Sequence, residues 1–269
     1  MNGWAIPTAT DVAFALGVLS LLGNRIPASL KIFLTAVAIA DDLGAIVIIA
    51  LFYTADLSLP MLFLAAVAIA MLIALNRQKI TRIAPYMIVG VILWVFVLKS
   101  GVHATLAGVA TAFAVPLKAT DTRGHAPLHR LEHSLHPWVA FAILPIFAFT
   151  NAGVSFGGIS PTALAEPLPL GIAVGLFAGK LTGVCGACAA LVPFGLAKLP
   201  EGATWHQIVG VAALCGVGFT MSLFIGSLAF EGSEYYTPLR LGVIAGSTLS
   251  GITGYLLLRF GSAHSKTNS

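Results

Sequence analysis

Residues 28–53 read ASLKIFLTAVAIADDLGAIVIIALFY, an apolar run with two adjacent aspartates, Asp41 and Asp42, near its middle. About 20 apolar residues suffice for a helix to cross the hydrocarbon core of a bilayer. Comparable runs recur along the chain, for example Leu168–Val192. A transmembrane β-barrel is instead marked by short segments of alternating hydrophobicity, and the sequence does not have this pattern. We therefore predict an all-α, polytopic membrane protein.

The composition agrees with this class. Hydrophobic residues make up 58% of the 269 residues and charged residues 9%, with a mean hydropathy of +0.96, whereas soluble domains carry roughly a quarter charged residues. The net charge of +4 comes from lysines and arginines that lie between apolar segments, where they orient a protein in the bilayer. The composition therefore indicates a lipid bilayer as the partner and no nucleic acid.

Hydropathy divides residues 1–269 into a single transmembrane domain of about nine spans. The polar connections between them are too short to hold a soluble domain. The predicted spans are 5–22, 28–53, 60–76, 84–98, 102–116, 131–153, 168–192, 205–230 and 237–259.

Charge in the connections predicts the orientation. Alternate connections carry most of the basic residues, so the positive-inside rule puts the C-terminus in the cytoplasm. An odd number of spans then puts Met1 outside, although no export signal precedes the first span and only Arg25 flanks its inner end. We therefore expect that spans are missing upstream and that the chain is N-terminally truncated.

Four charged residues fall inside predicted spans: Asp11, Asp41, Asp42 and Lys180. Each costs about 2.5–3.5 kcal/mol at a helix centre, so each needs a partner or a function. Adjacent residues point about 100° apart on a helix, so Asp41 and Asp42 cannot both face one partner. One can pair with Lys180 while the other faces a water-filled cavity and exchanges Na+ for H+. A buried ion-pair network that only fixes helix register is the structural alternative.

Two spans carry residues that interrupt helices. The first contains Pro7-Thr8-Ala9-Thr10-Asp11, and the eighth contains Cys215-Gly216-Val217-Gly218-Phe219-Thr220-Met221-Ser222. Paired interrupted segments indicate an inverted-repeat transporter with a site near the membrane midplane. Asp11 and Lys180 are suitable groups to balance the partial charges at half-helix ends. Close packing of small residues is the alternative explanation for the glycines.

A third feature is a cluster of titratable residues at the predicted cytoplasmic side. Histidine titrates near neutral pH, and a neighbouring carboxylate alters its titration, so the cluster can sense pH. An ordinary solvated loop and helix start explains it equally well. The cluster comprises His125, His129, Glu132, His133 and His136, and His103 stands apart near the outer face.

The blocks that carry these features resemble the NhaA family of bacterial Na+/H+ antiporters, in order and over essentially the whole chain. The matching blocks are Ala9–Gly17, Ala40–Ile46, Leu98–Gly108, Leu131–Trp138 and Cys215–Ser222. The resemblance implies a protein of the bacterial inner membrane with inverted repeats and two crossed discontinuous helices. It also implies that this chain corresponds to the last nine spans.

The resemblance also implies roles for individual residues. Asp42 is the central carboxylate for Na+ and H+, and Asp41 either binds the ion or pairs with Lys180. The ends of the broken helices are balanced by Asp11, Thr10 and Lys180, and one broken-helix segment contains Gly216, Gly218, Phe219 and Thr220. The residues associated with pH response are Glu132, His133, His136 and His103.

The function so implied is secondary active antiport, which exports Na+ (or Li+) in exchange for H+ and serves pH and sodium homeostasis. The substrates are Na+ and H+, no cofactor is needed, the protein is not an enzyme, and a homodimer is left open. A transport-inactive truncated fragment is one alternative. An intramembrane enzyme that uses the paired aspartates is another, although such a dyad needs two carboxylates that face each other.

Overall fold

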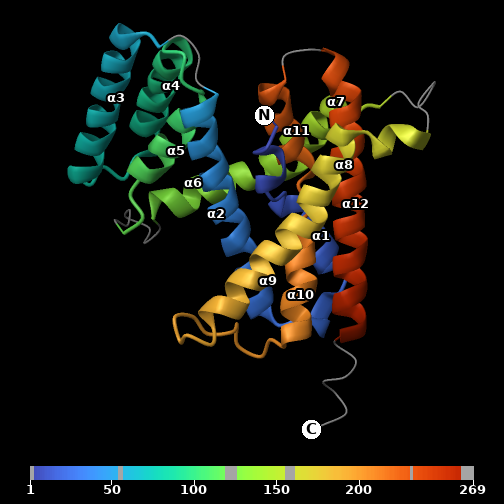
Figure 1. The fold of residues 1–269 in the computed structure, drawn as a ribbon. Helices are drawn as coiled ribbons and strands as arrows, with labels where there is room; N and C mark the ends of the chain where they lie inside the picture. The colour runs from blue at the N-terminus through green and yellow to red at the C-terminus, as the bar shows by residue number, and fades with distance from the viewer. Residues whose placement is uncertain (1–2, 54–56, 119–125, 155–160, 231–232, 262–269) are drawn as a thin grey trace. The chain divides into compact units, whose positions relative to one another are not determined.

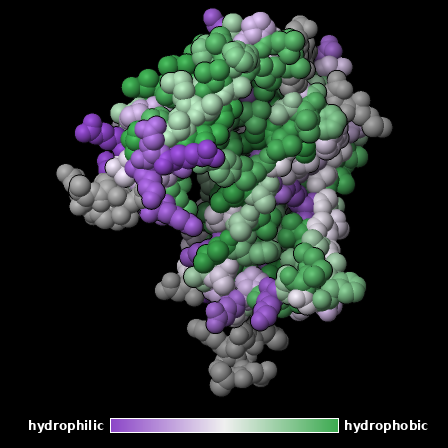
Figure 2. Space-filling model, turned by 90° about the vertical axis from the view of Figure 1, so that its left-hand side faces the viewer, coloured by the Kyte–Doolittle hydropathy of each residue, from purple (hydrophilic) through white to green (hydrophobic). Residues whose placement is uncertain are grey.

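A computed structural model describes residues 3–53, 57–118, 126–154, 161–230 and 233–261 (Figure 1). Helices are the only regular secondary structure in these ranges, which confirms the predicted all-α class. Hydrophobic side chains cover most of the face shown in Figure 2. Such a surface is expected where lipid, not water, surrounds the protein.

Five of the described helices are long and apolar enough to cross a membrane, and a bent pair of helices adds a sixth candidate. The five are Ala28–Phe52, Leu59–Arg77, Pro127–Asn151, Pro167–Leu191 and Tyr236–Gly261, and the bent pair is Trp205–Leu214 with Phe219–Ala229. The count of nine spans stays a prediction.

The chain forms two compact units, residues 1–45 with 147–269 and residues 46–146. The second unit holds the end of α2 (Ala28–Phe52) and the start of α7 (Leu144–Asn151). Between them come α3 (Leu59–Arg77), α4 (Ile83–Lys99), α5 (Thr105–Ala114), α6 (Pro127–Trp138) and the π-helical turn η3 (Val139–Ile143).

Small residues let α3, α4 and α5 pack closely in the second unit. Ala65 and Ala68 of α3 meet Tyr86 and Leu93 of α4 in a shared core. A Cβ atom added to Gly90 of α4 would lie 2.8 Å from the Thr111 side chain of α5, so the glycine permits this approach. Close contact through small residues is typical of helices packed in membranes.

The first unit contains the predicted site. It contains the greater part of α2, the remainder of α7 and several further elements, named here from the N-terminus to the C-terminus. These are η1 (Ile6–Thr8), α1 (Val12–Ser20), η2 (Gly23–Arg25), η4 (Pro161–Ala165), α8 (Pro167–Val174), the π-helical turn η5 (Gly175–Gly179), α9 (Lys180–Leu191), α10 (Trp205–Leu214), α11 (Phe219–Ala229), η6 (Ser233–Tyr235) and α12 (Tyr236–Gly261).

Both segments predicted to be discontinuous are interrupted in the structure. In the first, the backbone is extended at Ala9 and Asp11, between η1 and α1. We call residues 9–11 the first break. In the second, α10 ends before Cys215, α11 begins at Phe219, and the two helices are bent by 44°. We call residues 215–218 the second break.

The long helix α12 braces the first unit through glycines. A Cβ atom on Gly246 would lie 2.9 Å from Ala173 Cα and 3.1 Å from Leu176 Cβ, and one on Gly254 would lie 2.6 Å from Leu214 Cδ2. These contacts hold α12 against the α8–α9 helix and against α10. At Gly246 and Gly254, α12 is therefore packed against its neighbours without room for an added methyl group.

We predict that Gly246→Ala lowers the thermal unfolding temperature in detergent, because overpacking a tight contact costs about 1–3 kcal/mol. Gly186→Ala in α9 is the matched control, since a Cβ atom there meets nothing within 4 Å. The control should be neutral or stabilising by about 0.5–1 kcal/mol. Equal unfolding temperatures for the two variants would contradict the packing described for α12.

Candidate ion-binding site at two crossed helix breaks

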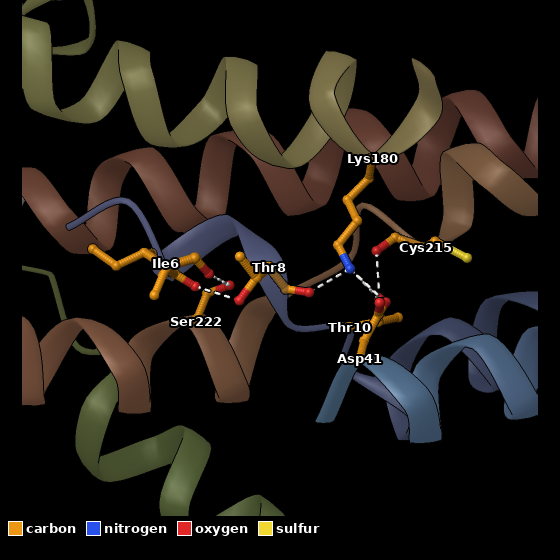
Figure 3. Close-up of polar contacts among 8 residues, drawn as sticks. Ile6, Thr8, Thr10, Asp41, Lys180, Cys215 and Ser222 are labelled. Atoms are coloured by element: carbon orange, nitrogen blue, oxygen red, sulfur yellow. Dashed lines mark hydrogen bonds and ion pairs between the residues drawn. The ribbon is translucent and has the colours of Figure 1, made fainter. Parts of the chain in front are cut away.

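Lys180 connects the first broken segment to α2. It begins α9 directly after the π-helical turn η5, a feature that often marks functional sites. Its ammonium group pairs with Asp41 Oδ2 and donates a hydrogen bond of 2.5 Å to the Thr8 carbonyl oxygen (Figure 3). The Lys180 side chain is 10% exposed and that of Asp41 25%, so the pair is largely withdrawn from the surface.

Thr10 lies between the ion pair and the second break. Its Oγ1 is 2.7 Å from Asp41 Oδ2, 2.8 Å from the Cys215 carbonyl oxygen and 3.2 Å from Lys180 Nζ (Figure 3). A hydroxyl group has one proton to donate, so Thr10 serves one of the two acceptors at a time while it accepts from Lys180. The hydroxyl therefore links the carboxylate of α2 to the end of α10.

Asp42 is left out of this pairing. It is half-buried, and within the described part of the chain its Oδ1 is buried without a hydrogen-bond partner. Buried polar atoms are nearly always satisfied, so an exception calls for an explanation such as an ion site. Carboxylate oxygens are suitable ligands for hard cations. As the angle between adjacent helical residues predicts, Asp41 takes Lys180 and Asp42 does not.

Asp11 caps two helices at once. Its Oδ1 accepts from the Phe14 backbone N–H at 3.1 Å, in the first turn of α1, and its Oδ2 accepts from the Thr220 N–H at 3.0 Å and from the Thr220 hydroxyl, in the first turn of α11. Asp11 is 2% exposed. A carboxylate at a helix N-terminus satisfies free N–H groups and complements the helix dipole. Asp11 is therefore the shared acceptor for the first turns of α1 and α11.

The carbonyl ends of the broken helices are satisfied by the opposite segment. Thr10 reaches the Cys215 carbonyl of the second break, and the Asp11 N–H donates to the Val217 carbonyl at 2.6 Å. In return, the Ser222 hydroxyl of α11 donates to the Ile6 carbonyl of η1 at 2.8 Å (Figure 3). The two breaks thus cross and complete each other's backbone hydrogen bonds.

The second break and the first two residues of α11 hold the remaining predicted site residues. A Cβ atom on Gly218 would lie 2.7 Å from Leu176 Cδ2 and 3.2 Å from the Ala9 carbonyl oxygen, so only glycine permits this approach to the first break. Gly216 is buried beside Leu176 and Ser250. The Phe219 ring packs edge-on against Phe14 at 4.9 Å between centroids. Thr220 binds Asp11, as described above.

The residues predicted to respond to pH lie in the other compact unit. Glu132, His133 and His136 are exposed on α6, and Glu132 Oε2 lies 3.5 Å from His129 Nδ1. His103 precedes α5, with its Nδ1 2.9 Å from Thr105 Oγ1. His125 lies outside the described residues.

Sequence reasoning placed Thr8 and Ser222 in the interrupted segments but gave them no hydrogen-bond partner, and it did not single out Ser247. Ser247 of α12 accepts from the Gly218 and Phe219 N–H groups. For Ser222, its place after the two glycines was a usable signal, since a hydroxyl near a helix break can satisfy freed backbone groups. For Ser247, nothing in the local sequence distinguishes it from other small residues of α12.

A polytopic helical membrane protein with carboxylates and a lysine gathered at two crossed helix breaks is the class that this fold and this site define. The family model described as Na+/H+ antiporter 1 matches residues 1–258. The chain belongs to this family.

Curated relatives support the same assignment. Na(+)/H(+) antiporter NhaA 2 of Pseudomonas syringae pv. syringae (strain B728a) is 59% identical over 260 residues, which cover 96% of this chain and 66% of the relative. Na(+)/H(+) antiporter NhaA of Rhodospirillum rubrum is 60% identical over 267 residues, covering 96% and 67%. NhaA 2 of Klebsiella pneumoniae subsp. pneumoniae is 56% identical over 265 residues, covering 98% and 69%. The chain spans about two thirds of the length of these relatives.

We predict that Asp11→Ala lowers the free energy of unfolding by about 2 kcal/mol, because it removes the caps of two helices and each cap is worth about 1 kcal/mol. Asp11→Asn should have an intermediate effect, since its single amide oxygen can accept from only one helix. Denaturant or thermal unfolding measures both variants.

The control for this prediction is Ser20→Ala in the same helix, α1. The Ser20 hydroxyl is exposed and donates to the Gly17 carbonyl of its own helix, so its removal should change stability by less than about 0.5 kcal/mol. An Asp11→Ala variant as stable as Ser20→Ala would refute the double cap.

Proposed function

We propose that this chain carries the ion-exchange site of a secondary active Na+/H+ antiporter, which exports Na+ or Li+ as H+ enters. The observation that carries the proposal is the buried Asp42 Oδ1, which has no partner among the described residues and lies beside the Asp41–Lys180 pair. The family and the names of the relatives support the same activity.

Exchange follows from the chemistry of a carboxylate. Asp42 can hold either a proton or a sodium ion, and occupancy by one excludes the other. A transporter that alternately exposes such a group to the two sides of the membrane therefore couples the movement of H+ to that of Na+. No cofactor takes part, and Na+ and H+ are substrates.

Asp41 and Lys180 serve this exchange in the proposed mechanism. Lys180 compensates the charge of Asp41 and also binds the Thr8 carbonyl, so its position depends on the first broken segment. A cation that approaches Asp42 adds positive charge near Lys180, and this repulsion weakens the hold of Lys180 on Asp41. Asp41 is then free to contribute an oxygen to the cation.

The protein is a multi-pass membrane protein. We place it in the bacterial inner membrane with a cytoplasmic C-terminus, because basic residues concentrate in alternate connections and the positive-inside rule assigns them to the cytoplasm. A homodimer stays a prediction.

An enzyme that uses the aspartate pair is disfavoured by the geometry. A dyad requires two carboxylates that share a proton, whereas Asp41 is engaged by Lys180 and Thr10 and Asp42 by neither. The second candidate is a chain that binds ions without transporting them. A vesicle assay of transport distinguishes this candidate from the antiporter, whereas a measurement of ion binding does not.

We predict that everted membrane vesicles containing the chain show a change in a pH-sensitive dye when Na+ is added, and that Asp42→Asn abolishes it. The asparagine side chain neither titrates nor offers a charged ligand to the cation. The matched control is Glu166→Gln, which removes an exposed carboxylate that makes no capping hydrogen bond to α8. Unchanged transport in Asp42→Asn would refute the site, and a silent unsubstituted chain would refute transport by this polypeptide.

We further propose that Glu132, His133, His136 and His103 tune the response to pH. Replacing both His133 and His136 by glutamine should shift the pH dependence of the dye response and leave the maximal response nearly unchanged, because histidine is a side chain suited to pH sensing and both residues lie on α6, outside the unit that holds Asp42. The control is His206→Gln on α10. A pH profile that overlays that of the unsubstituted chain would contradict the assignment.

A further inference from the structure

The first turn of α11 cannot be capped by its own N-cap residue. That residue is Gly218, which has no side chain. An added Cβ atom would overlap Ser222 Oγ and would lie 2.7 Å from Leu176 Cδ2 and 3.2 Å from the Ala9 carbonyl oxygen, so a serine, threonine or aspartate at this position would displace these groups. The close approach of the two breaks thus disfavours the residues that normally cap a helix.

Ser247 of the neighbouring helix α12 supplies the missing cap. Its Oγ accepts from the Gly218 N–H at 3.2 Å and from the Phe219 N–H at 3.1 Å, and the residue is 7% exposed. The next N–H group, that of Thr220, goes to Asp11 at 3.0 Å. The start of α11 is therefore held from two sides, by α12 and by the first break.

The hydrogen bonds to Ser247 of α12 differ from the other hydrogen bonds across the second break in the segment that provides the partner. Thr10 and Asp11 both belong to the first break. They form the hydrogen bonds to Cys215, Val217 and Thr220. These contacts fix the breaks relative to each other. Ser247 ties the pair to α12, the helix that glycines pack against α8 and η5, and η5 leads directly into Lys180.

We propose that Ser247 is a positioning residue for ion exchange, which keeps the crossed breaks in register with the helix that carries Lys180. It acts through Thr220 and Asp11 and touches neither Asp41 nor Asp42 in any described contact. Without the cap, the buried N–H group of Gly218 and the partly buried N–H group of Phe219 lose their acceptor, and the first turn of α11 shifts to find others. Thr10, which is bonded to both the second break and Asp41, moves with it. This inference rests on the proposed function.

Ser250 provides a matched control one turn further along α12. Ser250 is buried, as Ser247 is, but its Oγ has no hydrogen-bond partner within the described residues. Ser250→Ala therefore deletes the same atom from the same helix without removing a cap. Ser247→Thr is the rescue variant, because it keeps the hydroxyl. Its added methyl group has space in the apolar groove of about 450 Å³ that Ser247 lines with Phe14 and Val18.

The experiment uses the full chain in lipid nanodiscs and two measurements. Amide hydrogen exchange over residues 215–222 reports on the cap, and calorimetric titration with NaCl gives the Na+ dissociation constant. We expect Ser247→Ala to speed exchange at Gly218 and Phe219 and to weaken Na+ binding roughly fivefold, the factor that corresponds to a cap of about 1 kcal/mol. Ser250→Ala and Ser247→Thr should match the unsubstituted chain in both.

The outcomes are separable. Unchanged exchange in Ser247→Ala would show that Ser247 is not the cap, and faster exchange with unchanged Na+ affinity would reduce its role to stability; either result overturns the proposal. Weaker Na+ binding in Ser250→Ala equal to that in Ser247→Ala would also overturn it. The proposed function fails by a different result, the absence of a vesicle response in the unsubstituted chain, which does not alter the comparison of dissociation constants.

Discussion

The carboxylate of Asp11 accepts hydrogen bonds from the first turns of both α1 and α11, and the crossing of the two breaks depends on this shared cap. In a bilayer no water is available to satisfy the free N–H and carbonyl groups at a helix break, and each unsatisfied group costs several kcal/mol. Two breaks placed against each other solve this problem together. Asp11 and Thr10 serve the second break, and Ser222 of α11 serves η1.

The same constraint produces the site. Once the breaks are complete, Lys180 is the group that reaches both the Thr8 carbonyl of η1 and Asp41 of α2. The chemistry of α2 is thereby tied to the geometry of the broken segments. Asp42 is left with a buried oxygen that has no hydrogen-bond partner in the described structure, and for this reason we propose it as the group that binds a sodium ion or a proton. Scaffold and site are thus parts of one network.

Most of the site residues were predictable from the sequence, because a charged or helix-breaking residue carries a free-energy cost inside a membrane span. Asp11, Asp41, Asp42 and Lys180 stand out because charges are expensive in an apolar run, and Pro7, Gly216 and Gly218 because they disrupt helices. Ser247 could not be assigned, because a serine costs little in a membrane helix and its role depends on which carbonyl or N–H group lies opposite. That pairing is set by the packing of segments far apart in the chain.

The central claim is that Asp42 exchanges a proton for a sodium ion. Proton release on ion binding tests it most directly. The chain in nanodiscs, held in weakly buffered solution, is titrated with NaCl while a pH indicator records released protons, and choline chloride serves as the control salt. Our account predicts release that saturates together with Na+ binding and is absent with choline. Saturable Na+ binding without proton release would contradict it.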